Sequence, residues 1–185
     1  MPDLDILKQL IHPNAMVPLT VTYGKKSVEL SEPQYPSSVV TVSNVPEDAI
    51  VIKVDSFKSP DAVFSNSKGE CKRADYVIVS NANNKKRIIF IEIKATKDRE
   101  NSIIKQLTGA KCFMLYCQAI GKEFWNQNDF LKDYKYRFVS IGHTSIAKRK
   151  TRIERKCSSI HDQPEKMLKI ASPNHLQFNQ LAGAA

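Results

Sequence analysis

The sequence has no long apolar run and few cysteines. Because no stretch of about 18 consecutive apolar residues occurs, we expect no transmembrane helix and no membrane partner. The first residues, MPDLDILKQLIHPNA, are acidic and their apolar positions are interrupted, which is unlike a signal peptide. The spacing of Cys71, Cys112, Cys117 and Cys157 matches no zinc framework. These absences exclude the membrane-embedded and disulfide-rich secreted classes, and they predict a cytoplasmic protein with reduced thiols.

The chain of 185 residues has the composition of one globular domain, with 42% apolar and 25% charged residues. Its net charge of +9 is unevenly distributed, because the first 50 residues are net acidic and the remainder is strongly basic. A basic surface of this kind indicates an anionic partner, most often nucleic acid. Surface charge that merely keeps the protein soluble would explain the same composition.

Apolar patterning predicts a series of strands followed by one long helix. Residues 3–11 are typical of a short helix, residues 12–48 of short strands and turns, and residues 122–135 of a loop or short helix. The segments predicted to be strands are 49–57, 74–80, 87–95 and 135–142. The second and third of these are separated by NANNKK, which predicts a hairpin with a loop longer than the tight two-residue kind.

A helix is predicted after the hairpin, because one apolar stripe recurs at helical spacing. The stripe consists of Ile103, Leu107, Ala110, Met114 and Cys117. Asp98 is a suitable first-turn acid, and Gly121 is a suitable stop. Strands that precede and follow such a helix imply a mixed sheet with helices packed on it.

The stretch RIIFIEIKAT, residues 87–96, places two opposite charges within an otherwise apolar strand. Since strand side chains alternate between faces, Glu92 and Lys94 share the face of Phe90. Pairing the hairpin symmetrically about its two central asparagines makes paired residue numbers sum to 167. Asp75 then lies opposite Glu92, and directly opposed side chains have Cβ atoms about 5 Å apart.

Two carboxylates at that distance repel each other, and partial burial increases the cost. One lysine neutralises only one of them, whereas a divalent hard cation such as Mg²⁺, or Mn²⁺ in its place, offsets the rest. Asp75 and Glu92 are therefore predicted metal ligands, and Lys94 would act on the bound water. Such a site is suited to phosphodiester hydrolysis. A buried ion network in an ordinary sheet is the alternative interpretation.

An acid on one strand, E-x-K on the next and a following helix with glutamine together resemble the PD-(D/E)xK nuclease superfamily. The matching segments are KRADYVIV, FIEIKAT and IIKQLTGAK, with Ala74 where the nominal motif has proline. The resemblance implies a restriction-endonuclease-like α/β fold, with a central mixed four-stranded sheet flanked by helices. It covers residues 50–142, so 1–48 and 143–185 are interpreted as elaborations of a single domain, 1–185.

The resemblance also implies roles for particular residues. The catalytic set would be Asp75, Glu92, Lys94 and Gln106, and the main-chain carbonyl of Ile93 would be a further metal ligand. Many members of the superfamily use an additional acid from an N-terminal helix, for which Glu29, Glu32 and Glu47 are all candidates here. The expected reaction is Mg²⁺-dependent cleavage that leaves a 5′-phosphate.

Basic residues near these motifs, and the start of the dense basic run at 148–156, are expected to contact nucleic acid, although that run could instead be a solvated tail or helix face. DNA is favoured over RNA because most members of the superfamily act on DNA. The residues are Lys72, Arg73, Lys97, Arg99, Lys105, Lys148, Arg149 and Lys150. A homodimer or a larger defence or repair complex would be a suitable assembly. The alternative function is a catalytically inactive nucleic-acid-binding or scaffold subunit of such a complex.

Overall fold

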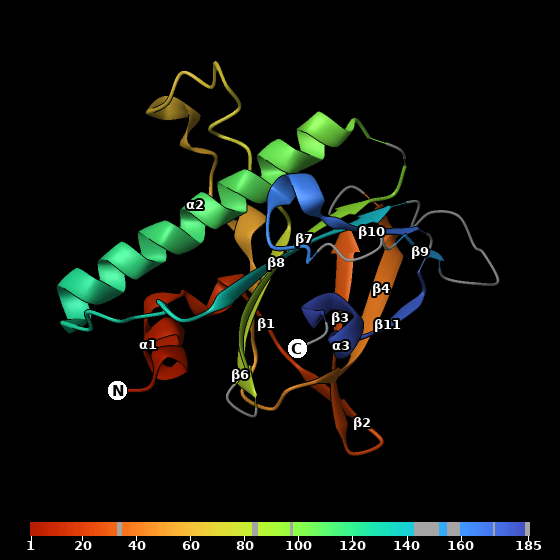
Figure 1. Cartoon of the computed structure of the whole chain (residues 1–185), viewed down its shortest axis with the longest axis horizontal. Coiled ribbons are helices and arrows are strands. Elements are labelled where there is room, and N and C mark those ends of the chain that lie inside the picture. The colour runs from red at the N-terminus through yellow and green to blue at the C-terminus, as the bar shows by residue number, and fades with distance from the viewer. Residues whose placement is uncertain are drawn as a thin grey trace.

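The computed structural model describes residues 1–32, 35–82, 85–96, 98–142, 152–154, 160–171 and 173–183, which form a mixed α/β structure (Figure 1). The α-helices are α1 (Asp3–Leu10), α2 (Glu100–Trp125) and α3 (Phe178–Ala182). The strands are β1 (Met16–Val17), β2 (Thr20–Thr22), β3 (Lys25–Glu32), β4 (Tyr35–Val45), β5 (Ile50–Lys53), β6 (Tyr76–Ala82), β7 (Lys85–Lys94), β8 (Lys135–Gly142), β9 (Arg152–Glu154), β10 (Leu168–Ala171) and β11 (His175–Gln177). Short 3-10 helices are η1 (Pro13–Ala15), η2 (Val54–Ser56), η3 (Pro60–Ala62) and η4 (Pro164–Lys166).

The described strands form two sheets. The larger has seven strands in the order β1-β5-β6-β7-β8-β10-β9, and the smaller has four in the order β11-β4-β3-β2. In the larger sheet β5, β6 and β7 are antiparallel, whereas β7, β8 and β10 run parallel. Strand β7 is therefore central. Its Ile-rich sequence is apolar on both faces, as expected for a strand that is covered on both sides.

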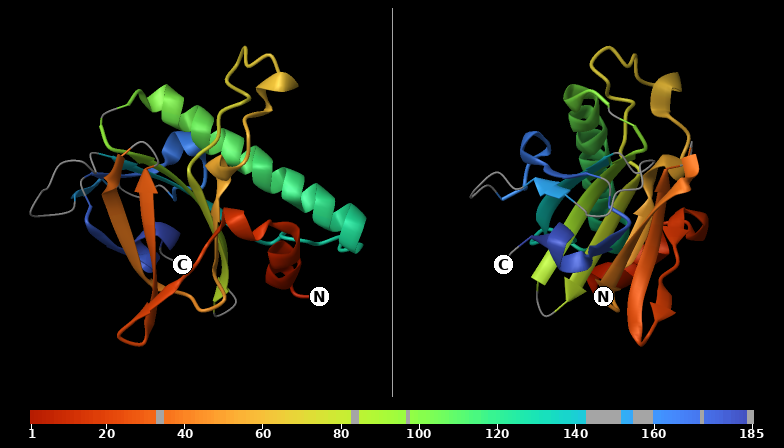
Figure 2. Two further views of the ribbon diagram at one scale, coloured as in Figure 1. Left: turned by 180° about the vertical axis from the view of Figure 1, so that it is seen from behind. Right: turned by 90° about the vertical axis from the view of Figure 1, so that its right-hand side faces the viewer.

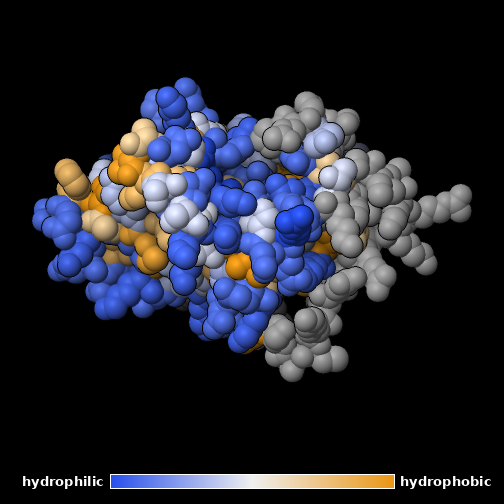
Figure 3. Space-filling view, turned by 90° about the horizontal axis from the view of Figure 1, so that it is seen from above, coloured by the Kyte–Doolittle hydropathy of each residue, from blue (hydrophilic) through white to orange (hydrophobic). Residues whose placement is uncertain are grey.

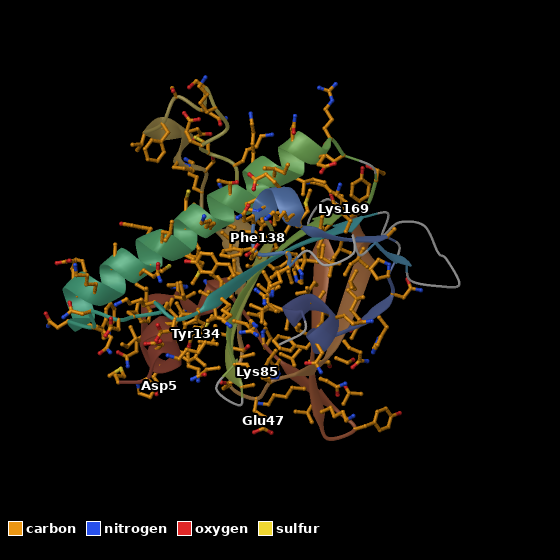
Figure 4. All side chains as sticks on the ribbon, in the orientation of Figure 1. Asp5, Glu47, Lys85, Tyr134, Phe138 and Lys169 are labelled. Atoms are coloured by element: carbon orange, nitrogen blue, oxygen red, sulfur yellow. The ribbon has the colours of Figure 1, made fainter. Side chains whose placement is uncertain are left out.

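Each face of the large sheet has its own apolar core. Phe90, Phe138 and Leu107 belong to the core on the side of α1 and α2, and the Phe90 and Phe138 rings stack with centroids 4.7 Å apart. Figure 4 labels Phe138. Ile89, Ile91 and other residues of the opposite face pack against β3, β4 and α3. Figure 2 shows the smaller sheet as a separate layer on the side of the large sheet away from α2.

The prediction of a four-stranded sheet with helices on both sides is therefore wrong in two respects, the number of strands and what covers one face. The predicted strands at 49–57, 74–80, 87–95 and 135–142 are present as β5 to β8, but further strands extend the sheet at both edges. A second sheet, rather than a layer of helices, covers one face. A sheet can cover another apolar sheet face as well as helices can, so the apolar pattern of β7 did not distinguish the two arrangements.

The predicted hairpin register is confirmed. Val77 pairs with Phe90 and Val79 with Ile88. The predicted six-residue loop is wrong, because pairing continues as far as Ala82 and Lys85, so that only two residues separate the strands. The polar residues that suggested a loop lie where both strands run beyond the apolar core.

The helix after the hairpin is confirmed as α2, and all five residues of its predicted apolar stripe are buried. Its predicted end is wrong, because the helix passes Gly121 and ends at Trp125, where Asn126 adopts the left-handed conformation with φ +53°. Gly121 has a packing role, since a Cβ built there would lie 2.1 Å from the ring of Phe130. Part of the segment 122–135 is thus helical.

Other predicted segments agree in part. Helix α1 lies within the predicted 3–11 helix, but the predicted strand 49–57 is divided into β5 and η2. Segment 12–48 does form strands, although β3 and β4 are longer than the short strands expected. The C-terminal region, whose sequence signals are weak, contributes β10, β11 and α3.

Gly109 is where α2 comes closest to the chain before β6. A Cβ built on Gly109 would lie 1.7 Å from the main-chain oxygen of Lys72. We expect Gly109→Ala to lower the free energy of unfolding by about 3 kcal/mol, because backbone must move to admit the methyl group. Chemical denaturation would measure it. Gly142→Ala is the control and should change stability little, since nothing lies within 4 Å of its Cβ position; equal losses in both variants would contradict the close approach.

Among the described residues, no helix is long and apolar enough to span a membrane. Cys71, Cys112 and Cys117 are free thiols, and the first and third are buried.

Candidate metal-binding active site

Asp75 and Glu92 lie together where β6 begins and β7 approaches its end. Tyr76 pairs with Ile91, and one further step of the same antiparallel register places Asp75 beside Glu92. The Oδ2 atom of Asp75 accepts a hydrogen bond of 2.7 Å from the main-chain N–H of Ile93. This bond holds the Asp75 side chain against β7, the strand that carries Glu92 and Lys94.

Glu92 is completely buried, with 0% of its side chain exposed. Its Oε1 atom lies 2.7 Å from Nζ of Lys94, whose side chain is 22% exposed. Lys94 and the main-chain N–H of Asp75 both lie near the Glu92 carboxylate, but in the described residues neither contact has the geometry of a full hydrogen bond. A buried carboxylate normally accepts well-formed hydrogen bonds, so the Glu92 carboxylate is under-satisfied.

Burial raises the pKa of both acids. The pKa of Asp75 rises to about 6, because desolvation outweighs the Ile93 hydrogen bond and the charge of Lys94. Burial also raises the pKa of Glu92 well above its usual value, and the neighbouring Asp75 raises it further. Lys94 and the main-chain N–H of Asp75 lower the pKa of Glu92, but their effect is smaller than that of burial and the Asp75 charge. Two acids with raised pKa values at one position indicate a site that lacks positive charge.

Lys94 remains a cation in this environment. Burial lowers its pKa, but the charges of Glu92 and Asp75 outweigh burial and leave the pKa above its ordinary value. The ammonium group is therefore charged at neutral pH, beside two acids and at the edge of the solvent-exposed surface.

The pKa of Asp75 leads to a stability prediction. Because its folded-state pKa is raised from 3.8 to about 6, Asp75 favours the folded protein fully below about pH 4, and this contribution is lost as the pH rises through about 6. Thermal unfolding in EDTA should therefore show a melting temperature that falls between pH 4 and 7. Asp75→Asn should flatten this slope, and an unchanged slope would contradict the assignment.

Two further acids approach Asp75 from other elements. Glu32, at the end of β3 in the smaller sheet, is buried and accepts a hydrogen bond from the main-chain N–H of Ala95. Asp55 lies in η2, and its Oδ1 atom is buried without a hydrogen-bond partner among the described residues. The charges of both acids raise the pKa of Asp75. Of the three N-terminal candidates, Glu32 is the one whose charge reaches Asp75, although it lies on a strand and not on a helix.

Asp55 lies in the short 3-10 helix η2, where burial raises its pKa although Lys53 and Arg73 lower it. Its N-terminal neighbour Val54 donates a main-chain hydrogen bond of 2.8 Å to the main-chain carbonyl oxygen of Asp75. The turn and the site are thus connected directly.

Gln106 lies on α2, which packs on the sheet face that carries Glu92 and Lys94. It is half-buried, and its Oε1 atom has no hydrogen-bond partner among the described residues. Gln106 thus lies at the border of the buried stripe of α2, as the helical spacing predicts. An amide oxygen in this state can accept a hydrogen bond from a water molecule or a substrate.

Four of the predicted nucleic-acid contacts lie close to these elements. Lys72 donates a hydrogen bond of 3.1 Å to Ser102 at the start of α2, and Arg73 follows it in the chain. Arg99 precedes α2, and the Lys105 side chain lies beside Gly69. Lys97, Lys148, Arg149 and Lys150 lie outside the described residues.

The donor set suits a hard divalent cation, which takes carboxylate oxygens, main-chain carbonyls and water. Asp75 and Glu92 supply two carboxylates, and in the described residues the Glu92 carboxylate accepts no hydrogen bond of full geometry. Over the described ranges, no three His, Cys, Asp or Glu side chains gather as a ligand cluster. The residues therefore fit an oxygen-rich ion that keeps several waters, such as Mg²⁺, and do not fit a closed zinc site.

Comparison of the chain with protein-family models, curated proteins and solved structures found no match.

Proposed function

We propose that the protein is a Mg²⁺-dependent nuclease that hydrolyses phosphodiester bonds, with DNA as the preferred substrate. One observation carries the proposal. Glu92 is completely buried beside a second acid, and Lys94 lies 2.7 Å away on its solvent-facing side. Moving two carboxylates from water into a protein interior costs roughly several kcal/mol per ion, and a single lysine offsets only part of that cost. A divalent cation bound between the carboxylates would supply the missing charge.

Asp75 and Glu92 would hold the cation, with the main-chain carbonyl of Ile93 as a further ligand. When bound, Mg²⁺ polarises the phosphoryl group and lowers the pKa of a bound water. Lys94, which stays protonated, would orient the attacking water and stabilise negative charge that develops on the phosphoryl oxygens. Glu32 and Asp55, whose charges act on Asp75, would add negative charge that strengthens cation binding.

Gln106 and the nearby cations would position the substrate. The unpartnered amide oxygen of Gln106 would accept a hydrogen bond from the attacking water. Lys72, Arg73, Arg99 and Lys105 would contact backbone phosphates on the helix side of the sheet, which makes binding dependent on salt. The products would be a 5′-phosphate and a 3′-hydroxyl.

We also propose that the core is related to the restriction-endonuclease-like fold. Strands β5 to β8 are consecutive in the sheet, with two antiparallel pairs followed by one parallel pair, and α2 connects the parallel strands. The acidic pair and the lysine lie on the two central strands of this unit. On this proposal the smaller sheet and the additional edge strands are elaborations of the core.

The test is a cleavage assay with the full chain. Supercoiled plasmid, linear duplex, single-stranded DNA and RNA would each be incubated with the protein in Mg²⁺, Mn²⁺ or EDTA. We expect cleavage of at least one DNA substrate in either metal, none in EDTA, and products with 5′-phosphates. Cleavage that persists in EDTA, or the absence of cleavage on every substrate, would contradict the proposal.

A further inference from the structure

A hollow of about 250 Å³ opens on the surface between α1, β5 and α2. It is lined mostly by apolar side chains, among them Phe57, Phe113 and Tyr116. Two of the aromatic side chains that line it are largely open to solvent, because Phe57 is 40% exposed and Tyr116 is 66% exposed. Figure 3 shows apolar surface gathered toward the end of the molecule where α2 ends. An exposed aromatic surface of this kind marks a binding region.

The hollow is connected to the acid site through the polypeptide backbone. Val54 lines the hollow, and its N–H donates the 2.8 Å hydrogen bond to the main-chain carbonyl oxygen of Asp75. Along α2, Phe113 follows Gln106 by seven residues, which is about 10 Å at the helical rise of 1.5 Å per residue. About three stacked nucleotides of a strand cover that length. A strand whose cut phosphate lies beside Gln106 can therefore reach Phe113 with a nucleotide about three positions away.

Arg73 joins the two regions. It precedes Asp75 by two residues, and its guanidinium group lies 4.3 Å from the ring centroid of Phe57. Phe57 in turn stacks on Phe113, with centroids 5.6 Å apart and an interplanar angle of 21°. A planar cation and stacked aromatic rings form a surface on which bases can stack. Lys53 and His12 add polar groups to the rim of the hollow.

We propose that this hollow receives an unpaired nucleobase of the substrate, which makes the preferred substrate single-stranded nucleic acid or a duplex with unpaired nucleotides next to the cut. This inference rests on the proposed nuclease function and specifies its substrate class. A base inside a duplex is stacked between its neighbours, so only an unpaired or extruded base can enter an aromatic hollow. The combination of apolar walls with Lys53 and Arg73 suits a base attached to a phosphate backbone better than an uncharged apolar ligand.

The test compares three labelled DNA ligands by fluorescence anisotropy. They are a short single strand, the same strand with abasic sites, and a blunt duplex, all measured in Mg²⁺ with the Lys94→Ala variant so that the ligands stay intact. We expect the base-bearing strand to bind more tightly than the other two. Adding Phe57→Ala or Tyr116→Ala should weaken binding of that strand by about 10- to 100-fold and leave the abasic strand unchanged. Tyr116 is largely exposed, so its variant should fold normally.

The matched control is Phe124→Ala, which removes a 78% exposed aromatic from the same helix outside the hollow. It should leave the affinity for all three ligands unchanged. Equal affinity for the base-bearing and abasic strands would overturn the proposal, as would equal losses in the Phe124 and Phe57 variants. Metal-dependent cleavage without base-dependent binding overturns the role of the hollow alone. Base-dependent binding without any cleavage supports the hollow and overturns the nuclease proposal.

Discussion

Lys94→Ala is expected to lower the rate of metal-dependent cleavage by about 10²- to 10³-fold, the usual cost of removing one group that stabilises charge in a transition state. The ammonium group lies 2.7 Å from Glu92 Oε1 and is partly open to solvent, so it can contact both a bound water and a phosphate. The two carboxylates remain in the variant. Metal binding and DNA affinity should therefore change much less than the cleavage rate.

The measurement is single-turnover cleavage of the best DNA substrate, with melting temperature and DNA affinity recorded for each variant. Lys122→Ala is the control, because Lys122 is an exposed lysine near the end of α2 whose ion pair with Glu123 spans 3.9 Å. It should cleave at the wild-type rate. A Lys94→Ala variant that folds, binds DNA and cleaves like the wild type would remove Lys94 from the reaction.

The second large effect concerns stability. In EDTA, Glu92→Gln should raise the free energy of unfolding by about 1 kcal/mol, because the neutral amide removes the repulsion with Asp75 and the cost of a buried charge. If Glu92 and Lys94 instead formed a buried ion pair with a purely structural role, removing one partner would destabilise the protein by about 3–5 kcal/mol. The two interpretations thus predict changes of opposite sign.

Urea denaturation in EDTA and in Mg²⁺ would measure this difference. Mg²⁺ should stabilise the wild-type protein and should have a much smaller effect on Glu92→Gln, since one ligand is lost. Glu100→Gln is the control; its carboxylate pairs with Lys169 at 2.7 Å on the surface, where a substitution changes stability by less than about 1 kcal/mol. Strong destabilisation by Glu92→Gln would support the structural ion network.

The central hairpin and its charges could be predicted from the sequence because local rules determine them. Alternation along RIIFIEIKAT assigns Glu92 and Lys94 to one face, and the symmetric hairpin register assigns Asp75 to the opposite strand. The helical spacing of apolar residues likewise predicted the buried stripe of α2 and the position of Gln106 at its border. Each of these inferences depends on residues that are close in sequence.

The features that the sequence did not predict depend on contacts between residues far apart in the chain. The sequence offered Glu32 only as one of three candidate acids, because the contact that distinguishes it reaches Ala95 across 63 positions and from a different sheet. The smaller sheet itself is built from β2 to β4 together with β11, which pairs with β4 from the far end of the chain. Gly121 looked like a helix stop, but its lack of a side chain accommodates Phe130.

Local composition also misled the interpretation of the hairpin loop. The segment NANNKK is polar in sequence, yet its outer residues pair as strand, Asn81 with Lys86 and Ala82 with Lys85. Polarity reports exposure, whereas a turn is determined by backbone geometry, so the two need not coincide. The expectation of helices on both faces failed for a related reason, since an apolar strand face does not specify what covers it.

Calorimetric titration of the metal-free protein with Mg²⁺ or Mn²⁺ tests most directly whether the acid pair is a cation site, and it needs no knowledge of the substrate. We expect one class of site to bind the metal and binding to release protons near pH 6, because the pKa of Asp75 is raised to about 6. Glu92→Gln should abolish both signals. Absence of binding, or equal binding by the wild type and Glu92→Gln, would contradict the proposed cation site.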